Sequence, residues 1–326
     1  MGNNIKKKVL FLGVGLYNYD TLITNELAKK YDVSYIYLVP VKKLAKWKYS
    51  LLSHLCQREY LRKLNSEMLL SEFQKVKDVA FDYIFVIKGS RLENVHIESM
   101  NSFFPNAKKI LYLWDSWSLI ENKPVLEEGF SEIYSFDSED CKKYGFKLRP
   151  LFYTSSDNLK SEKIYDVSFV GTDHSDRLEK LRAFRDLCRH NSFSYFLRLK
   201  TTGMPLLRAC FNSGRYQRAD LEILTSSFMT YDEVMDITRK SRVVLDFAHP
   251  VQCGLTIRTL ESLAMGCKLI TSNKYIRKYQ DIPNTSYRII NEESKSSIIE
   301  FLQDNKTSIT IPEHYSLKSF LDDLVK

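Results

Sequence analysis

The chain has 326 residues, which is more than one hydrophobic core usually serves, so two domains are expected. Hydrophobic residues make up 44% of it and charged residues 27%, proportions that exclude a disordered or fibrous chain. The net charge of +8 lies entirely within residues 1–77, because residues 78–152 carry −3 and residues 153–326 carry +3. A charge confined to one segment, without a nucleic-acid-binding motif, argues against a nucleic-acid partner.

Cysteine usage and the amino-terminal sequence predict the compartment. The six cysteines form no CxxC pair, and no apolar leader follows the polar start MGNNIKKK. No window approaches the roughly 18 to 20 uninterrupted apolar residues that a membrane span requires. We therefore expect a reduced, disulfide-free cytoplasmic protein that is either soluble or peripherally attached to the inner face of the cell membrane.

The first half of the chain alternates between strand-like and helix-like segments. Its apolar, β-branched and aromatic runs cover residues 7–14, 33–39, 81–87, 109–115 and 132–137, with helix-like stretches between them. Such alternation predicts a parallel sheet, and the lack of polar alternation within the strands indicates helices on both of its faces.

After a polar linker at 154–163, the pattern restarts. Strand-like runs follow at 165–172, 194–199, 243–248, 268–272 and 286–290. We therefore predict an α/β protein of two Rossmann-like doubly wound domains, 1–152 and 153–326, facing a central cleft, with the last helix as a candidate to pack back on the first domain.

The segment HPVQCGLTIRTLESLAMGCKLITSN (249–273) holds the densest group of candidate binding residues. Gly254 frees the backbone before a predicted helix whose first amides can meet a phosphate, and Thr256 and Arg258 lie in or beside its first turn. Glu261, one turn further on, is placed to accept ribose hydroxyls and is expected to face the nucleotide. The alternative is a surface Arg–Glu pair followed by an ordinary helix cap at Gly266.

The stretch QCGLTIRTLESLAMGCKLITSN, which includes Leu255, resembles the GT-B nucleotide-sugar glycosyltransferases, especially bacterial capsule, lipopolysaccharide and exopolysaccharide enzymes and the spore-maturation-like group. The resemblance lies in an Arg-x-x-Glu-x-x-Ala-x-Gly pattern in the domain that holds the nucleotide. It implies a nucleotide-sugar donor in the second domain and makes Glu261 the ribose-binding acid. It also makes DVSFVGTDHSDR the first strand and turn of that domain, with Gly171, Thr172 and Arg177 near the diphosphate.

One departure from the family pattern concerns the reaction's stereochemistry. The common retaining pattern has a glutamate eight positions before the ribose glutamate, where this chain has Cys253. Whether the enzyme retains or inverts is therefore open. Asp246 and His249 are candidates for the missing polar contacts, although either is equally compatible with a loop cap.

Charge neutralisation without a metal is expected at the donor diphosphate. Arg198 and Lys200 lie two positions apart on a strand and share one face, which suits joint contact with an anion or, equally, two solvated strand-end cations. No metal or other cofactor is expected, because the six histidines show no ligand spacing and DSED opens a predicted helix, where Asp137 or Ser138 would serve as the N-cap.

For the acceptor, the candidate residues lie in the first domain. Trp114 and Trp117 flank Asp115, a combination suited to stacking on a sugar while a carboxylate takes a hydroxyl proton, and Asp115 is the candidate base if the enzyme inverts. A buried aromatic corner is the alternative. Gly13 and Gly15 form either a ligand-facing loop or a tight turn.

The predicted function is transfer of a sugar from a nucleotide-diphosphate donor to a glycan or lipid-linked glycan in bacterial surface polysaccharide synthesis. The alternative is a non-catalytic nucleotide- or glycan-binding protein of the same fold. Residues 40–63 carry a net charge of +6 with Trp47, Tyr49 and several leucines, which suggests peripheral contact with anionic lipid or, alternatively, a solvated helix face.

Overall fold

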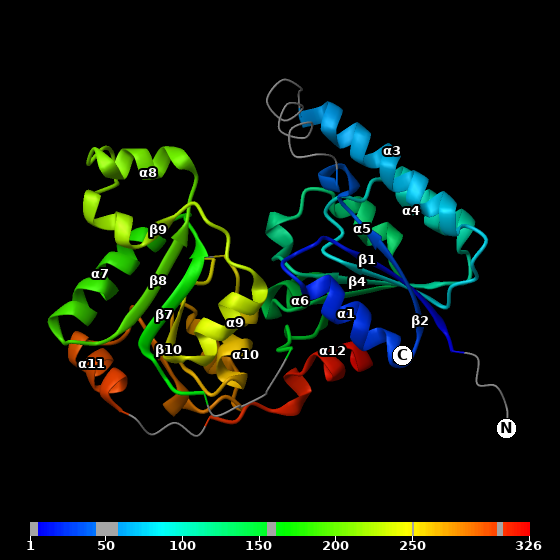
Figure 1. Ribbon diagram of the computed structural model, residues 1–326. Coiled ribbons are helices and arrows are strands. Elements are labelled where there is room, and N and C mark those ends of the chain that lie inside the picture. The colour runs from blue at the N-terminus through cyan, green and yellow to red at the C-terminus, as the bar shows by residue number, and fades with distance from the viewer. Residues whose placement is uncertain (1–5, 44–57, 155–160, 250, 305–308) are drawn as a thin grey trace. The chain divides into compact units, whose positions relative to one another are not determined.

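The computed structural model describes residues 6–43, 58–154, 161–249, 251–304 and 309–326. Within them the chain forms two compact units, each with its own parallel sheet (Figure 1). The first unit contains residues 1–151 together with 251–254 and 317–326, and the second contains residues 152–250 and 255–316. Relative to the expected division at 152/153, the two additional segments of the first unit are the loop at 251–254 and the last helix.

The first sheet has the strand order β2-β1-β3-β4-β5-β6, with all neighbours parallel. Its strands are β1 (Lys8–Gly13), β2 (Asp32–Tyr37), β3 (Tyr83–Ile87), β4 (Lys108–Leu113), β5 (Glu132–Ser135) and β6 (Lys147–Leu148). The central strands β1, β3 and β4 are almost completely buried, as their uninterrupted apolar sequences predict.

Helices of the first unit follow the strands as crossovers. They are α1 (Tyr19–Ala28), α3 (Arg58–Val76), α4 (Asn94–Phe103), α5 (Lys123–Gly129), α6 (Ser138–Tyr144) and, from the end of the chain, α12 (Leu317–Leu324). Phe320 of α12 packs edge-on against Tyr112 of β4, with ring centroids 4.7 Å apart, and Arg149 forms an ion pair with Asp323 at 2.9 Å. These contacts attach the last helix to the first unit.

The second sheet has the strand order β12-β11-β10-β7-β8-β9, again parallel throughout. Its strands are β7 (Tyr165–Thr172), β8 (Tyr195–Lys200), β9 (Leu224–Thr225), β10 (Ser241–Asp246), β11 (Lys268–Thr271) and β12 (Tyr287–Ile289). The helices of this unit are α7 (Arg177–His190), α8 (Gly203–Cys210), α9 (Tyr231–Arg239), α10 (Ile257–Ala264) and α11 (Lys295–Gln303). The predicted α/β class with two doubly wound units is confirmed.

Candidate functional site

The carboxyl ends of β7 and β10 are the natural place for a ligand in the second unit. Numbered within this unit, the strand order is 3-2-1-4-5-6, so the direction of the order reverses between β7 and β10, which pair directly. In open parallel sheets ligands bind at this switch point, beyond the carboxyl ends of the strands. The segments that follow there are residues 173–176 after β7 and 247–249 after β10.

Two arginines cross this edge of the sheet. The Arg258 guanidinium donates to the Val170 carbonyl at 2.7 Å and lies 4.8 Å from the centre of the Phe169 ring. Arg177 donates to the carbonyls of Thr172 (3.2 Å) and Phe247 (2.9 Å). Arg258 also lies 3.7 Å from the buried Asp246 carboxylate. Carbonyl, ring and carboxylate contacts therefore hold the two guanidinium groups in place at this edge, where they are suited to contact an anion.

Gly171, between these contacts, leaves room for the Phe169 ring on which the Arg258 guanidinium lies. A Cβ there would lie 2.8 Å from the Phe169 ring and 3.5 Å from the Arg177 guanidinium. The structure therefore brings together Gly171, Thr172, Arg177 and Arg258, as the resemblance implied, and adds Phe169 as the ring beneath the guanidinium groups.

Two histidines accompany the arginines. Burial lowers the pKa of His174, and the positive charges of Arg177 and Arg258 and the neighbouring His249 lower it further, against a smaller opposing effect of Asp173. The Nδ1 atom of His249 is buried and has no hydrogen-bond partner within the part of the chain that the structure describes. Such an atom is costly unless a ligand or water satisfies it.

Asp246 fixes the start of α10 beside these groups. Its Oδ2 atom accepts hydrogen bonds from the hydroxyls of Thr256 (2.9 Å) and Thr259 (2.8 Å), and Thr256 caps the helix by accepting from the Thr259 amide. Asp246 is only 1% exposed. The sequence interpretation of Asp246 as a ligand contact is therefore replaced by a positioning role, and Thr256 is engaged in the same network.

Two further members of the 249–273 segment are explained by packing. Leu255 is completely buried, so it is a core residue. Gly254 clusters with the first unit, where a Cβ would lie 2.2 Å from the Phe136 carbonyl oxygen, and the neighbouring Cys253 amide donates to Asp137 at 3.0 Å. Close backbone packing, and not phosphate contact, explains the glycine at 254.

Glu261 is also more enclosed than the sequence suggested. Its side chain is 3% exposed, and Oε1 accepts from the Tyr231 hydroxyl at 2.9 Å and from the Thr154 hydroxyl at 3.5 Å. Burial, followed by the Glu261 charge, raises the pKa of Tyr231, which stays a neutral donor. The expectation that Glu261 does not face the core is therefore contradicted by its burial, whereas its contact with a nucleotide stays a proposal. The exposed Arg–Glu surface pair is excluded as well.

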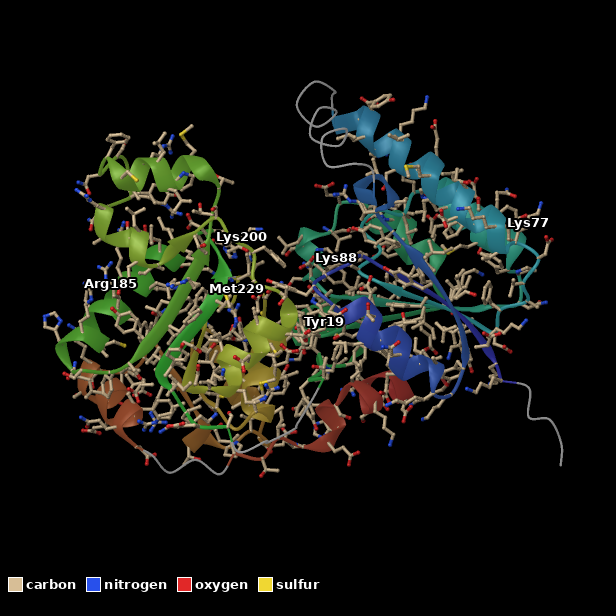
Figure 2. All side chains as sticks on the ribbon, viewed as in Figure 1. Tyr19, Lys77, Lys88, Arg185, Lys200 and Met229 are labelled. Atoms are coloured by element: carbon tan, nitrogen blue, oxygen red, sulfur yellow. The ribbon has the colours of Figure 1, made fainter. Side chains whose placement is uncertain are left out.

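Arg198 and Lys200 have different partners. Arg198 donates to the Glu222 carbonyl at 2.8 Å and lines a hollow of about 470 Å³ formed by residues of β8, β9 and the segment before β9. The Lys200 ammonium instead lies 4.6 Å from the centre of the Phe228 ring. Figure 2 shows Lys200 at the end of its strand. Joint contact of the two cations with one anion is not what the structure shows.

In the first unit, the glycine loop after β1 is filled by a side chain of the protein. The Asp20 carboxylate accepts from the Gly15 amide at 2.8 Å and from the Tyr35 hydroxyl at 2.7 Å, and a Cβ on Gly13 would lie 2.2 Å from that carboxylate. Gly15 has φ of +67°. Gly13 and Gly15 therefore form the tight turn that was the alternative, closed by an acid.

Residues after β3 and β4 form a second candidate site, at the carboxyl edge of the first sheet. The Lys88 ammonium lies 2.6 Å from the Asp115 carboxylate, and both side chains are partly exposed. The Trp114 ring is 5.6 Å from the ring of Tyr19, which begins α1. Figure 2 labels Lys88 and Tyr19 within this unit. Asp115, Lys88 and Trp114 thus combine a carboxylate, a cation and aromatic surface, with the buried Tyr19 ring packed against Trp114.

Trp117 does not belong to this group. It is 1% exposed and packs edge-on against Phe146 at 5.0 Å. Its rings are part of the core, so the expected acceptor contact at Trp117 is wrong, and at this position the buried aromatic corner was the better interpretation. The predicted N-cap at Asp137 is confirmed, because its side chain accepts from the Glu139 and Asp140 amides.

Two further observations concern metals and membranes. Within the described ranges, no three or more His, Cys, Asp or Glu side chains gather where they could hold a metal ion. None of the helices in those ranges is long and apolar enough to cross a bilayer. Most of the basic segment 40–63 lies outside the described residues, so its proposed lipid contact stays a prediction.

Sequence reasoning missed several residues of the two sites. His174 and Tyr231 were not singled out, although His174 follows a strand within the quoted family stretch and Tyr231 opens a predicted helix. Lys88 stands directly after a buried strand and before a glycine, with φ of +71°. A charged residue at the carboxyl end of a central strand is a feature of the sequence that could have indicated Lys88 as a site residue. Nothing in the sequence indicated Tyr19.

Comparison with known proteins gives no match to a family model or to a curated sequence. Solved structures are similar along almost the whole chain. UDP-GlcNAc 2-epimerase from Methanocaldococcus jannaschii, solved with UDP-GlcNAc and UDP, has a TM-score of 0.55 at 12% identity, covering 97% of this chain and 99% of its own. An α,α-trehalose 6-phosphate synthase from Burkholderia multivorans has a TM-score of 0.54 at 11% identity, covering 98% and 97%.

A third similar structure is an α-glucosyltransferase in complex with UDP and DNA, with a TM-score of 0.54 at 12% identity, covering 91% of this chain and 89% of its own. Identities this low show a shared fold and not a shared activity. Together with the two parallel six-stranded sheets, they show that the chain has the GT-B fold.

Proposed function

We propose that the protein transfers a sugar from a nucleoside-diphosphate donor to an acceptor hydroxyl, with the donor diphosphate at the carboxyl ends of β7 and β10. One observation carries the proposal: Arg177, Arg258 and the unsatisfied Nδ1 atom of His249 lie at the switch point of a sheet with the nucleotide-binding strand order. The similar structures support it, since two of the three contain UDP.

On the donor side, the chemistry requires stabilisation of the departing diphosphate. Negative charge on its oxygens develops as the sugar–oxygen bond breaks, and the fixed guanidinium groups of Arg177 and Arg258 and the first amides of α10 are suited to it. Glu261 remains the proposed ribose-binding acid. Because its carboxylate already accepts from Tyr231, a ribose hydroxyl would replace or join that donor.

On the acceptor side, we propose that Asp115 is the general base. An acceptor hydroxyl oxygen attacks the anomeric carbon, its proton passes to the Asp115 carboxylate, and the nucleoside diphosphate leaves, which corresponds to inversion. Lys88 orients the carboxylate through their 2.6 Å contact, and the partly exposed Trp114, packed against the buried Tyr19 ring, offers aromatic surface to the sugar. The finer proposals from sequence are a bacterial surface polysaccharide as product, a glycan or lipid-linked acceptor, a cytoplasmic location and no metal.

The decisive experiment compares His249→Ala with His190→Ala, a matched control at the exposed end of α7. A panel of nucleotide sugars is screened for thermal stabilisation, and release of nucleoside diphosphate and glycosidic product is then measured with the best binder. We expect binding and transfer in the wild type, weakened binding in His249→Ala and no change in His190→Ala.

Each of the other outcomes would support a different function for the protein. Binding without turnover favours the non-catalytic binding protein. Conversion of the donor sugar without a glycosidic product favours an isomerase, an activity named among the similar structures. Absence of nucleotide binding would contradict the proposal altogether.

A further inference from the structure

Helix α8 in the second unit exposes its apolar side chains. Met204, Leu207 and Phe211 are 58%, 53% and 75% exposed, and their spacing places them on one side of the helix. The opposite side is the one that packs inward, with Ala209 completely buried and Leu206 against the core of the unit. A surface helix normally carries polar residues on its solvent side. The exposed apolar row on α8 therefore indicates a surface that binds a partner.

The same segment is strongly basic. Residues 200–219 contain Lys200, Arg208, Arg215 and Arg218 and no aspartate or glutamate. Arg215 is occupied by an ion pair with Asp173. The guanidinium groups of Arg208 and Arg218 form no hydrogen bond or ion pair to any residue in the described ranges, and Arg208 lies within the apolar row itself. We define Met204, Leu207, Arg208, Phe211 and Arg218 as the α8 face.

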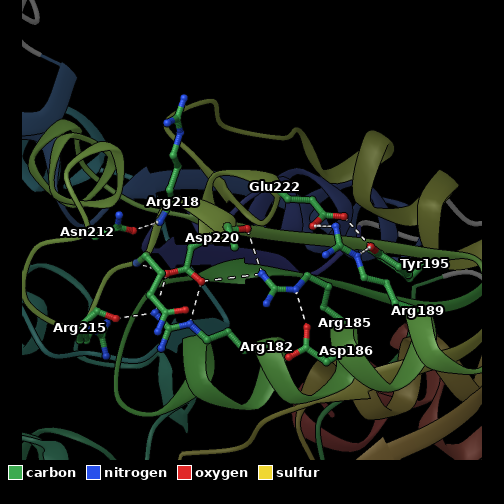
Figure 3. Close-up of polar contacts among 12 residues, drawn as sticks. Arg182, Arg185, Asp186, Arg189, Tyr195, Asn212, Arg215, Arg218, Asp220 and Glu222 are labelled. Atoms are coloured by element: carbon green, nitrogen blue, oxygen red, sulfur yellow. Dashed lines mark hydrogen bonds and ion pairs between the residues drawn. The ribbon is translucent and has the colours of Figure 1, made fainter.

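The nearby acids are already neutralised. Asp220 is completely buried and accepts from Arg182 at 2.5 and 2.7 Å, while Glu222 is paired with Arg189 at 2.7 Å. Figure 3 shows this network and the Arg218 side chain extending away from it. Since α8 packs against the 218–222 segment, the uncompensated positive charge and the apolar row belong to one surface.

We propose that the α8 face docks on an anionic lipid surface. Leucine, methionine and phenylalanine side chains enter the boundary between headgroups and acyl chains, while arginines extend to the lipid phosphates. A protein partner would have to bury Arg208 in the middle of its apolar contact. In a two-fold pairing of this face with a second copy, Arg208 and Arg218 would meet like charges, and the segment offers no acid to neutralise them. A lipid surface avoids both costs.

The proposal is independent of the transfer reaction and of segment 40–63, because lipid binding is measured without a donor and each segment can be altered alone. The full chain is tested by flotation with phosphatidylcholine vesicles that contain about one-third phosphatidylglycerol. The test variants are Leu207→Gln/Phe211→Gln and Arg208→Gln/Arg218→Gln. The controls are Leu148→Gln/Ile164→Gln, which alters exposed apolar residues elsewhere, and Lys142→Gln/Lys143→Gln, which removes two exposed cations elsewhere.

We expect the wild type to float with anionic vesicles at low salt and much less with pure phosphatidylcholine. The arginine variant should lose about tenfold or more in lipid affinity, since each basic residue near the surface contributes about fivefold. The apolar variant should lose at least as much, and neither control should change. All test side chains are exposed, and thermal melting verifies that the variants fold.

Several results would overturn the proposal. One is a wild type that fails to float, and another is a test variant that floats like the wild type. A third is loss of all binding in Lys42→Gln/Lys43→Gln/Lys46→Gln/Lys48→Gln while both α8 variants bind normally, which would assign lipid contact to 40–63 alone. Concentration-dependent self-association that Leu207→Gln/Phe211→Gln abolishes would identify a second copy as the occupant.

Discussion

The loop after β1 in the first unit and the loop after β7 in the second hold the same topological position, at the carboxyl end of each unit's first strand. In the first, the buried Asp20 carboxylate fills the turn and accepts from the Gly15 amide, and burial raises its pKa. In the second, the corresponding space is crossed by Arg177, with Arg258 close by. Two similar sheets therefore place an acid in the first loop of one unit and two arginines beside the first loop of the other.

This difference shows how one architecture can divide two tasks. An acid in the first βα turn satisfies the backbone amide that a phosphate would otherwise use, so that edge is unsuited to a second anion. At the same edge of the first sheet, the partly exposed Lys88 and Asp115 side chains are instead suited to contact a hydroxyl. If the comparison is correct, changes at the two edges should separate transfer from donor binding.

The largest effect is expected at the first edge. Asp115→Asn removes the proposed base, so kcat for transfer should fall by about 10² to 10⁴ while the donor dissociation constant is unchanged. Steady-state kinetics and calorimetry measure the two quantities, and Glu121→Gln, an exposed acid in the same unit, is the control. An unchanged kcat would exclude Asp115 as base and reopen the retaining mechanism.

The next effect tests the second edge. Arg258→Gln removes a charge-assisted contact of roughly 1.5–3 kcal/mol, so the UDP dissociation constant should rise about ten- to a hundredfold. Arg189→Gln, which alters an arginine paired with Glu222 at the far end of α7, serves as the matched control in calorimetry. Equal weakening in both variants would mean that general positive charge, and not this edge, attracts the nucleotide.

A smaller effect concerns stability. Glu261→Ala should lower the free energy of unfolding by about 1–3 kcal/mol, because the part-buried hydroxyl of Tyr231 loses its charged acceptor and keeps only its contact with Thr154, whereas Glu261→Gln should lower it less. Denaturant unfolding measures both. If Glu261→Ala is as stable as the wild type, Tyr231 does not depend on this bond, and the side chain expected from sequence, which faces the nucleotide and not the core, becomes the better description.

Glu261 also illustrates what the sequence could and could not predict. Alternation of apolar runs predicted ten of the strands of both sheets, because period and residue type suffice for long buried strands. The two-residue strands β6 and β9 were missed, since they depend on neighbouring strands and have no pattern of their own. Burial of Trp117 and Leu255 follows from tertiary packing, which local composition does not encode.

Residues of the candidate site could be predicted from sequence where a recognisable motif lies at the end of a predicted strand. Arg258 was found because it stands in the first turn of a predicted helix, whereas Gly171 and Arg177 came from the resemblance of DVSFVGTDHSDR to the first strand and turn of a nucleotide-holding domain. The roles of Asp246 and Gly254 were assigned incorrectly, because their actual partners, Thr259 and the Phe136 carbonyl, lie in other parts of the fold. Sequence analysis could not predict which side chains distant in the chain contact these residues, and this limited the prediction of the site.

A few-fold effect is expected from pH. Burial and the neighbouring arginines lower the pKa of His174, and a bound diphosphate should raise it again, so binding takes up a proton. The ratio of the UDP dissociation constant of His174→Gln to that of the wild type should therefore increase as the pH falls from 7 to 5. Calorimetry at several pH values gives this ratio. A ratio that stays constant with pH would mean that His174 does not interact with the bound diphosphate.

The smallest expected effect is that of chelation. If the guanidinium groups of Arg177 and Arg258 and the start of α10 neutralise the diphosphate, no divalent ion is needed for that task, and EDTA should leave the transfer rate nearly unchanged. The assay is initial rate with EDTA, then with added magnesium or manganese. Loss of activity that either ion restores would mean that the positive edge of the second sheet is insufficient. Acids near it, Asp173 first, would then have to be tested as ligands, although Asp173 is already paired with Arg215. The contrast between an acid-closed and a cation-lined loop would then no longer explain which unit holds the donor.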